Sequence, residues 1–72
     1  MEFGAELALA RTERGLTQTE LAGMMGIKQP NLARLEAGDQ DPRLDTLRAM
    51  ARALAADIVI KADGAVEVRL NE

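Results

Sequence analysis

The spacing of apolar residues changes from helical to strand-like along the chain. Between residues 5 and 14, Leu7 and Ala10 recur at helical spacing in an alanine-rich segment, and Gly15 follows as a helix-ending residue. The C-terminal segment instead alternates apolar and polar positions on both sides of an Asp-Gly pair. This pattern predicts a series of helices that ends in a β-hairpin.

A capping box marks the start of the second helix. Thr17 would cap the N-terminus, and Glu20 would reach back to the Thr17 amide. The apolar residues at 21, 22 and 25 then face inward, and Gly26 can adopt the left-handed conformation of a tight turn. Ile27 follows and is expected in the core.

The third helix is expected over residues 29–37. Pro30 falls in its first turn, where the missing amide hydrogen costs nothing. Leu32 and Leu35 form the buried stripe, and Gly38 ends the helix. This segment therefore predicts a short helix with one polar side.

A polar turn at residues 39–42 leads to a fourth helix. Asp45 is expected to cap this helix, which would end near Ala55. Its apolar residues fall on one face. The residues expected to be buried there are Leu47, Met50, Ala51 and Leu54.

The alternating segment predicts two strands over residues 57–72. Two strands alone are marginal in water, and the helices offer no sheet for them to join. A second copy of the same tail would complete the sheet, so we expect a homodimer. The dimerisation residues expected in this tail are Ile58, Val59, Ile60, Val66, Val68 and Leu70.

Composition excludes most catalytic chemistry. The 72 residues allow one small core and include no cysteine, histidine, serine, tyrosine or tryptophan. Disulfides, thiolate metal sites and most general bases are therefore missing, so neither an enzyme nor a cofactor is expected. No apolar run reaches the roughly 20 residues of a membrane span, and the N-terminus lacks a basic signal region. We expect a cytoplasmic protein.

The net charge of −3 argues against nucleic-acid binding, because basic surfaces supply most non-specific affinity. The distribution of charge weakens this objection, since the acidic residues of the tail need not face DNA. Several basic residues cluster in the first two-thirds of the chain, among them Arg11, Arg14, Lys28, Arg34 and Arg43.

The second and third helices have the spacing of a helix-turn-helix unit. With Gln18 as the first position, Ala22 is fifth, Gly26 ninth, Leu32 fifteenth and Leu35 eighteenth. An ordinary pair of helices in a small bundle would explain any one of these offsets. It does not explain all of them together with both caps.

The motifs R-x-x-R-G-L-T-Q-x-E-L-A and G-I-K-Q-x-x-L-x-x-L-E-x-G resemble the XRE family of phage-repressor and Cro-like domains over residues 5–56. The resemblance implies a mainly α, four- to five-helix repressor-like domain over residues 1–56, followed by a dimerisation tail. The segment ADIVIKADGAVEVRL resembles the strand extension of HipB-like and HigA-like antitoxins from type II toxin–antitoxin pairs.

The resemblance also implies which side chains meet DNA. Gln18 would donate to a phosphate at a helix N-terminus, and Gln29 would offer its amide to a base edge, adenine being its natural partner. At Pro30 and Ala33 the family often carries hydroxyl residues, so contacts there would rest on thymine methyl groups. The full set expected at DNA is Gln18, Thr19, Lys28, Gln29, Pro30, Asn31, Arg34 and Arg43.

Arg11 and Glu36 are implied to be structural. The family resemblance suggests a partly buried ion pair between the first and third helices, and breaking a fully buried pair costs about 3–5 kcal/mol.

The function expected is that of a repressor dimer on double-stranded operator DNA, with recognition helices about 34 Å apart. We expect this repressor to be an antitoxin, which represses its own operon and also neutralises a cognate toxin. Two alternatives remain open: a phage- or plasmid-type repressor without a toxin, and a protein-interaction module that has lost DNA binding.

Overall fold

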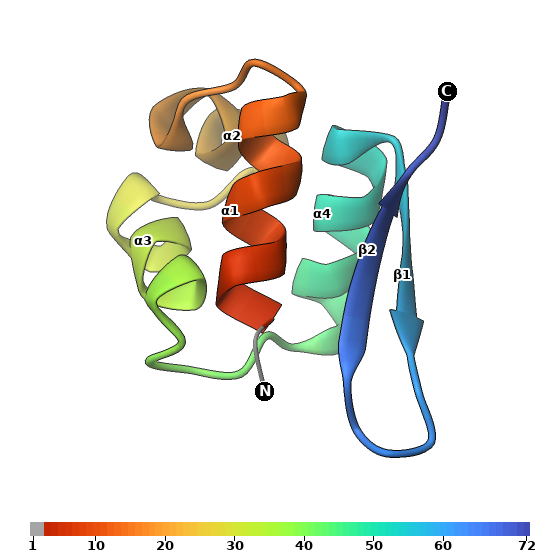
Figure 1. Ribbon diagram of the computed structural model, residues 1–72. Coiled ribbons are helices and arrows are strands. Elements are labelled where there is room, and N and C mark those ends of the chain that lie inside the picture. Colours follow the sequence, from red (N-terminus) through yellow and green to blue (C-terminus); the bar gives the residue numbers. More distant parts are fainter. Residues whose placement is uncertain (1–2) are drawn as a thin grey trace.

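The computed structural model describes residues 3–72 and contains four helices followed by a two-stranded antiparallel sheet (Figure 1). The predicted fold class is thus confirmed, with four helices in the described chain. The elements are α1 (Phe3–Glu13), α2 (Gln18–Met25), α3 (Gln29–Ala37), α4 (Leu44–Leu54), β1 (Ala56–Ile60) and β2 (Val66–Leu70).

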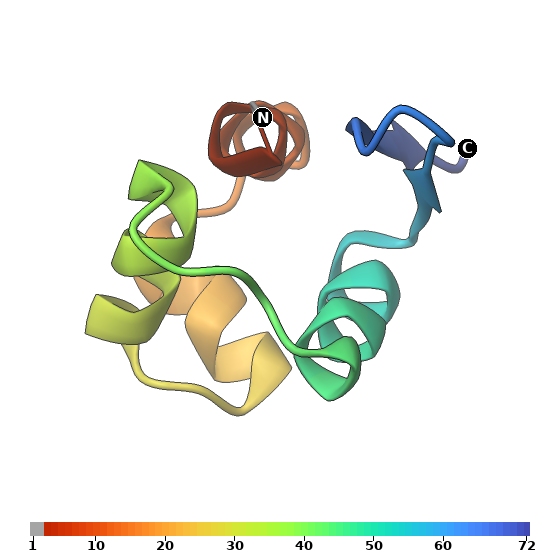
Figure 2. The same ribbon diagram turned by 90° about the horizontal axis from the view of Figure 1, so that it is seen from below.

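Helix α1 packs between α3 and the sheet. It contacts α3 on one side and β2 on the other, while α2 packs on α4 and α4 packs on β1 (Figures 1 and 2). One apolar cluster joins all six elements. Its fully buried side chains are Leu7, Leu21, Leu32, Met50 and Leu54. No helix in the described part of the chain is long and apolar enough to span a bilayer.

The helix ends follow the predicted chemistry at α2 and α3. The Thr17 hydroxyl accepts from the Glu20 amide at 3.1 Å, and the Glu20 carboxylate accepts from the Thr17 amide at 2.8 Å. Gly26 and Gly38 end α2 and α3 in the left-handed conformation, with φ of 73° and 79°. The capping box and both glycine ends are therefore confirmed.

The predicted start of α4 is wrong. The helix begins at Leu44 with Arg43 as its N-cap, and no side chain among residues 3–72 caps it. Asp45 lies inside the first turn, where its carboxylate accepts from the Thr46 amide at 2.9 Å. An acidic residue is favourable both at the cap and in the first turn, so the sequence did not separate the two positions.

The hairpin is covered by its own chain. The strands pair in the register Ile58 with Val68 and Ile60 with Val66. One face of the sheet packs on the core cluster through Ile58, Val66, Val68 and Leu70. Helices α1 and α4 therefore cover this face within one chain, so burial of the face does not itself require the second copy of the tail.

Arg14 holds the end of the hairpin against the helices. Its guanidinium donates to the carbonyl oxygens of Leu54 at 2.8 Å, Ala55 at 3.0 Å and Asn71 at 2.5 Å. These bonds tie the end of α1 to the end of α4 and to the chain after β2. Arg14 is therefore committed to the fold and does not join a basic surface.

Gly4 sets the distance between α1 and α3. Helix α1 starts two residues earlier than predicted, and Phe3 and Gly4 are both buried there. A Cβ on Gly4 would overlap the Glu36 carbonyl oxygen and would lie 2.9 Å from that of Leu35. Only glycine allows this approach of the two helices.

Replacing Gly4 with alanine should destabilise the protein. The added methyl must push α1 away from backbone atoms of α3, a cost of about 1–3 kcal/mol for overpacking. Gly23→Ala is the matched control, because the space around Gly23 is open and alanine favours a helix by about 0.5–1 kcal/mol. Urea unfolding should show a lower free energy of unfolding for Gly4→Ala than for wild type, and a higher one for Gly23→Ala. Equal free energies of unfolding for the two variants would contradict the close contact between Gly4 and the backbone of α3.

The capping box should give stability a dependence on pH. The bonds from the Thr17 amide and hydroxyl lower the pKa of Glu20 below its ordinary 4.5. A lowered pKa in the folded state means that the contribution is complete above 4.5 and is lost as pH falls through the lowered value. Wild type should therefore exceed Glu20→Gln in free energy of unfolding at neutral pH. The difference should vanish in strong acid, and a constant difference at all pH values would refute the linkage.

Candidate nucleic-acid interface

Helices α2 and α3 form the helix-turn-helix unit. Gly26 makes the turn between them, and the amide of Ile27 donates to the Ala22 carbonyl at 3.0 Å. Leu32 and Leu35 are buried beneath α3. The opposite side of α3 is polar and faces solvent.

Arg11 and Glu36 join α1 to α3 by a two-point ion pair. The guanidinium donates from Nε to Oε2 at 2.7 Å and from Nη2 to Oε1 at 3.0 Å, and Nη1 donates to the Leu16 carbonyl at 2.9 Å. The side chains are only 15% and 6% exposed. The hydrogen bond to Glu36 raises the pKa of Arg11 above its ordinary value.

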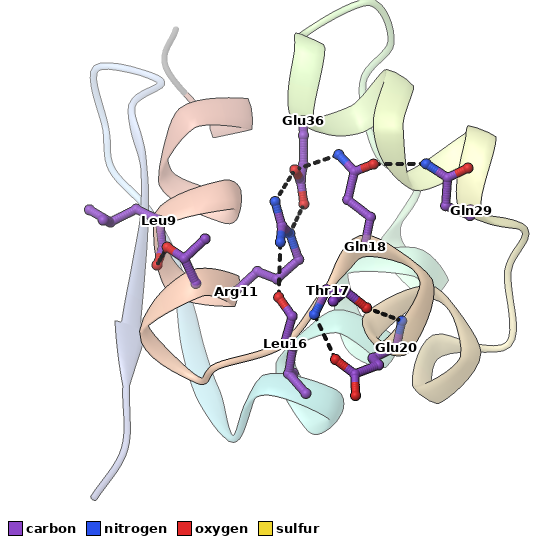
Figure 3. A network of polar contacts seen from close by, with 9 residues as sticks. Leu9, Arg11, Leu16, Thr17, Gln18, Glu20, Gln29 and Glu36 are labelled. Atoms are coloured by element: carbon purple, nitrogen blue, oxygen red, sulfur yellow. Dashed lines mark hydrogen bonds and ion pairs between the residues drawn. The ribbon is translucent and has the colours of Figure 1, made fainter.

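The same carboxylate holds Gln18, and Gln18 holds Gln29 (Figure 3). Gln18 Nε2 donates to Glu36 Oε1 at 3.0 Å, and Gln29 Nε2 donates to Gln18 Oε1 at 2.7 Å. A carboxylate only accepts, so the Gln18 amide must turn its nitrogen toward Glu36 and its oxygen toward Gln29. The orientation of both amides follows from Glu36.

Gln29 keeps two groups free in this arrangement. One N–H of its amide is used on Gln18, which leaves the second N–H and the carbonyl oxygen. A glutamine uses this pair of groups on the N7 and N6 positions of adenine. The first residue of α3 is therefore held in a conformation suited to base recognition.

The other residues expected at DNA gather mostly at the N-termini of α2 and α3. Thr19 is exposed on the first turn of α2. Lys28 is the exposed N-cap of α3, and no side chain in the described part of the chain caps that helix end. Pro30 and Asn31 are exposed on the first turn of α3, and Arg34 Nη1 donates to Asn31 Oδ1 at 3.2 Å.

Arg43 lies across a shallow groove from α3. The groove is lined by Asn31, Arg43, Gln40 and Thr46, among others. The Arg43 side chain is 85% exposed, and Asp45 lies 3.7 Å away. An exposed pair of this kind is worth little, so Arg43 remains available to a phosphate.

Sequence reasoning missed the continuous connection from Arg11 to Gln29. The sequence prediction treats Gln18 as a phosphate contact and Glu36 as the partner of Arg11, with no link between the two. In the structure, Glu36 Oε1 accepts hydrogen bonds from both Arg11 and Gln18. The signal available was a glutamine at the start of each helix of the unit. Gln40 and Thr46 were also missed, because only the folded turn brings them beside Asn31.

The solved structure of the restriction-modification controller protein C.AhdI from Aeromonas hydrophila is similar to this chain. Its TM-score is 0.73 with 31% identity, covering 75% of this chain and 82% of that one. The helical core and its helix-turn-helix unit are thus shared with a regulator of known structure.

Two curated relatives match shorter segments. An uncharacterised helix-turn-helix transcriptional regulator from Haemophilus influenzae is 43% identical over 42 residues, which is 58% of this chain and 43% of the relative. Antitoxin HigA1 from Mycobacterium tuberculosis is 46% identical over 41 residues, which is 57% of this chain and 28% of HigA1. This chain therefore spans less than half of either relative.

The model of the helix-turn-helix family matches residues 7–60, which include the whole α2–turn–α3 unit and the residues that orient Gln29. These residues have the fold of a helix-turn-helix transcriptional regulator, and the chain belongs to the XRE-type helix-turn-helix family.

Proposed function

We propose that this protein is a cytoplasmic repressor that binds a palindromic operator as a homodimer and regulates its own gene. The observation that carries the proposal is the bond series Arg11–Glu36–Gln18–Gln29, which holds the first residue of α3 with an N–H and an oxygen free. Holding a side chain in its binding conformation before contact lowers the entropic cost of recognition.

The positive charge available to phosphates is small and local. Arg11 is paired with Glu36 and Arg14 with backbone carbonyls, so Lys28, Arg34 and Arg43 remain on the exposed surface around α3. The uncapped start of α3 adds the positive end of its helix dipole. With a net charge of −3, affinity for unrelated DNA should be weak.

A repressor dimer would place two copies of α3 in successive major grooves, about 34 Å apart. Gln18 and Thr19 would meet the backbone at the start of α2, where free amides favour phosphates. Asn31 and Arg34 would extend the contact along α3, and Pro30 would meet thymine methyl groups.

An interaction module without DNA binding is the alternative from a different class. The acidic balance and the apolar Pro30 and Ala33 on α3 favour it. The conformation of Gln29 opposes it, because one N–H and the carbonyl oxygen of the Gln29 amide stay free for a base edge.

An antitoxin role is a second candidate. It rests on the identity with HigA1, which is confined to 41 residues, and on the strand-forming tail. In that role, the repressor would also bind and neutralise a cognate toxin. A plain phage- or plasmid-type repressor would share the DNA chemistry and lack the toxin.

Replacing Gln29 with alanine should lower affinity for the DNA upstream of its own gene by about 10- to 100-fold, since a bidentate base contact is worth about 1–3 kcal/mol. Affinity for unrelated DNA should not change. Gel-shift titrations with wild type and variant on both fragments, at several salt concentrations, measure this. Unchanged operator affinity would refute the assignment of Gln29.

Two charge variants serve as controls. Lys28→Ala should lower the affinity for both DNA fragments by the same factor. It should also reduce the slope of log K against log salt by about one unit. Arg52→Ala removes the same charge from the exposed side of α4 and should change neither value. Circular dichroism of all three variants should match wild type.

The antitoxin role predicts that a neighbouring gene encodes a growth inhibitor. Expression of that neighbour alone should arrest growth, and co-expression of this chain should restore it. If the Gln29→Ala variant still restores growth, neutralisation of the toxin does not depend on DNA binding. A harmless neighbour would leave the plain repressor as the function.

A further inference from the structure

The sheet has one covered edge and one open edge. The outer edge of β2 runs beside α1, and the Val68 amide faces the Glu6 carboxylate at 3.5 Å. Within residues 3–72, no strand pairs with the outer edge of β1, which lies at the margin of the molecule (Figure 1). Unpaired N–H and C=O groups on such an edge are a template for another strand.

The hydrogen bonds of the hairpin show which residues point outward. The Lys61 amide donates to Ala65 and the Asn71 amide to Ala55, both at 2.8 Å. The N–H and C=O groups of successive residues point to opposite edges of a strand. Those of the odd-numbered residues of β1 therefore point to β2. The N–H and C=O groups of Ile58 and Ile60 therefore point to the open edge.

We propose that a second copy of this chain pairs with this edge, β1 antiparallel to β1, with the twofold axis at Val59. In this register, Ile58 of each copy exchanges both backbone hydrogen bonds with Ile60 of the other. Val59 lies opposite Val59 in a close, non-hydrogen-bonded pair. The two hairpins then form one continuous four-stranded sheet.

Charge complementarity selects this register. With the axis at Val59, Asp57 of each copy lies directly opposite Lys61 of the other, so two opposite-charge pairs flank the centre. An axis at Asp57 would place two aspartates face to face, and an axis at Ile58 would place Asp57 opposite Val59. Like charges directly opposite are destabilising, and only the Val59 axis matches each charge directly.

Lys61 is already positioned for this contact. It lies 3.2 Å from Glu67 on the solvent face of its own hairpin, and its side chain is 49% exposed. Asp57 is exposed on the same face. Asp57 of the second copy would approach Lys61 from the open side of β1.

Apolar residues beside the edge would be covered as well. Ile60 is 65% exposed and Leu44 is 63% exposed, the largest such fractions among the exposed large apolar side chains of the described chain. Both line a groove between α4 and β1, together with Leu47 and Ala51. In the proposed register, Ile58 of the second copy lies opposite Ile60 on the core-facing side of the sheet.

The β1 edge would be the interface of the dimer in the proposed function, on which this inference rests, and its test does not use DNA. Asp57→Lys should weaken dimerisation because two lysines would then face each other at two places. Lys61→Asp should weaken it because two aspartates would face each other there. Each change should raise the dimer dissociation constant by about tenfold or more. Sedimentation velocity measures both, with circular dichroism as the check on folding.

Mixing the two variants is the decisive experiment. Every facing pair in the mixed dimer is of opposite charge, so native mass spectrometry should detect the heterodimer and little of either homodimer. The double variant Asp57→Lys/Lys61→Asp should recover the wild-type dissociation constant. Glu13→Lys makes the same change of charge on the exposed end of α1 and should leave the dimer intact.

The outcomes separate this inference from the proposed function. A monomeric wild type at high micromolar concentration, or dimers that ignore both charge reversals, would overturn the β1 interface. If the dimer binds the operator but both charge-reversal variants keep the wild-type dissociation constant, the β1 interface is wrong and the repressor function is supported. If both charge reversals weaken the dimer and the dimer binds no operator, the β1 interface is supported and the repressor function is wrong.

Discussion

The carboxylate of Glu36 is the interaction on which the functional part of the molecule depends. It accepts two bonds from Arg11, which fixes α3 against α1, and one from Gln18, which fixes α3 against α2. Because it only accepts, it also sets the orientation of the Gln18 amide and, through it, that of Gln29. Stability of the fold and geometry of the recognition surface therefore share one buried charge.

Local chemistry was predictable from the sequence where a residue has a single structural use. The capping box at Thr17 and the glycine ends at Gly26 and Gly38 are of this kind, and they placed α2 and α3 correctly. Asp45 has two favourable positions at a helix start, and the prediction chose the wrong one. Local patterns were therefore reliable only where they admitted one reading.

Contacts between distant residues were not predictable in the same way. The approach of Gly4 to the Glu36 carbonyl, the bonds of Arg14 to three carbonyls and the cover of the hairpin by α1 and α4 all depend on tertiary packing. For the site, the predicted surface residues Pro30, Asn31 and Arg34 of α3 are exposed, whereas Gln29 is half-buried. The sequence did not show that Gln29 donates to Gln18, or that Glu36, near the other end of α3, sets the orientation of both amides.

In the proposed repressor, the orientation of Gln18 would limit how the target sequence can change. An arginine at position 29 could still donate to the Gln18 oxygen and would favour guanine, so a single substitution can reach that base. A glutamate at position 29 would meet an acceptor oxygen, so cytosine requires a second change at position 18. Under the proposed function, the accessible operators would be biased toward purine contacts, and positions 18 and 29 should diverge as a pair.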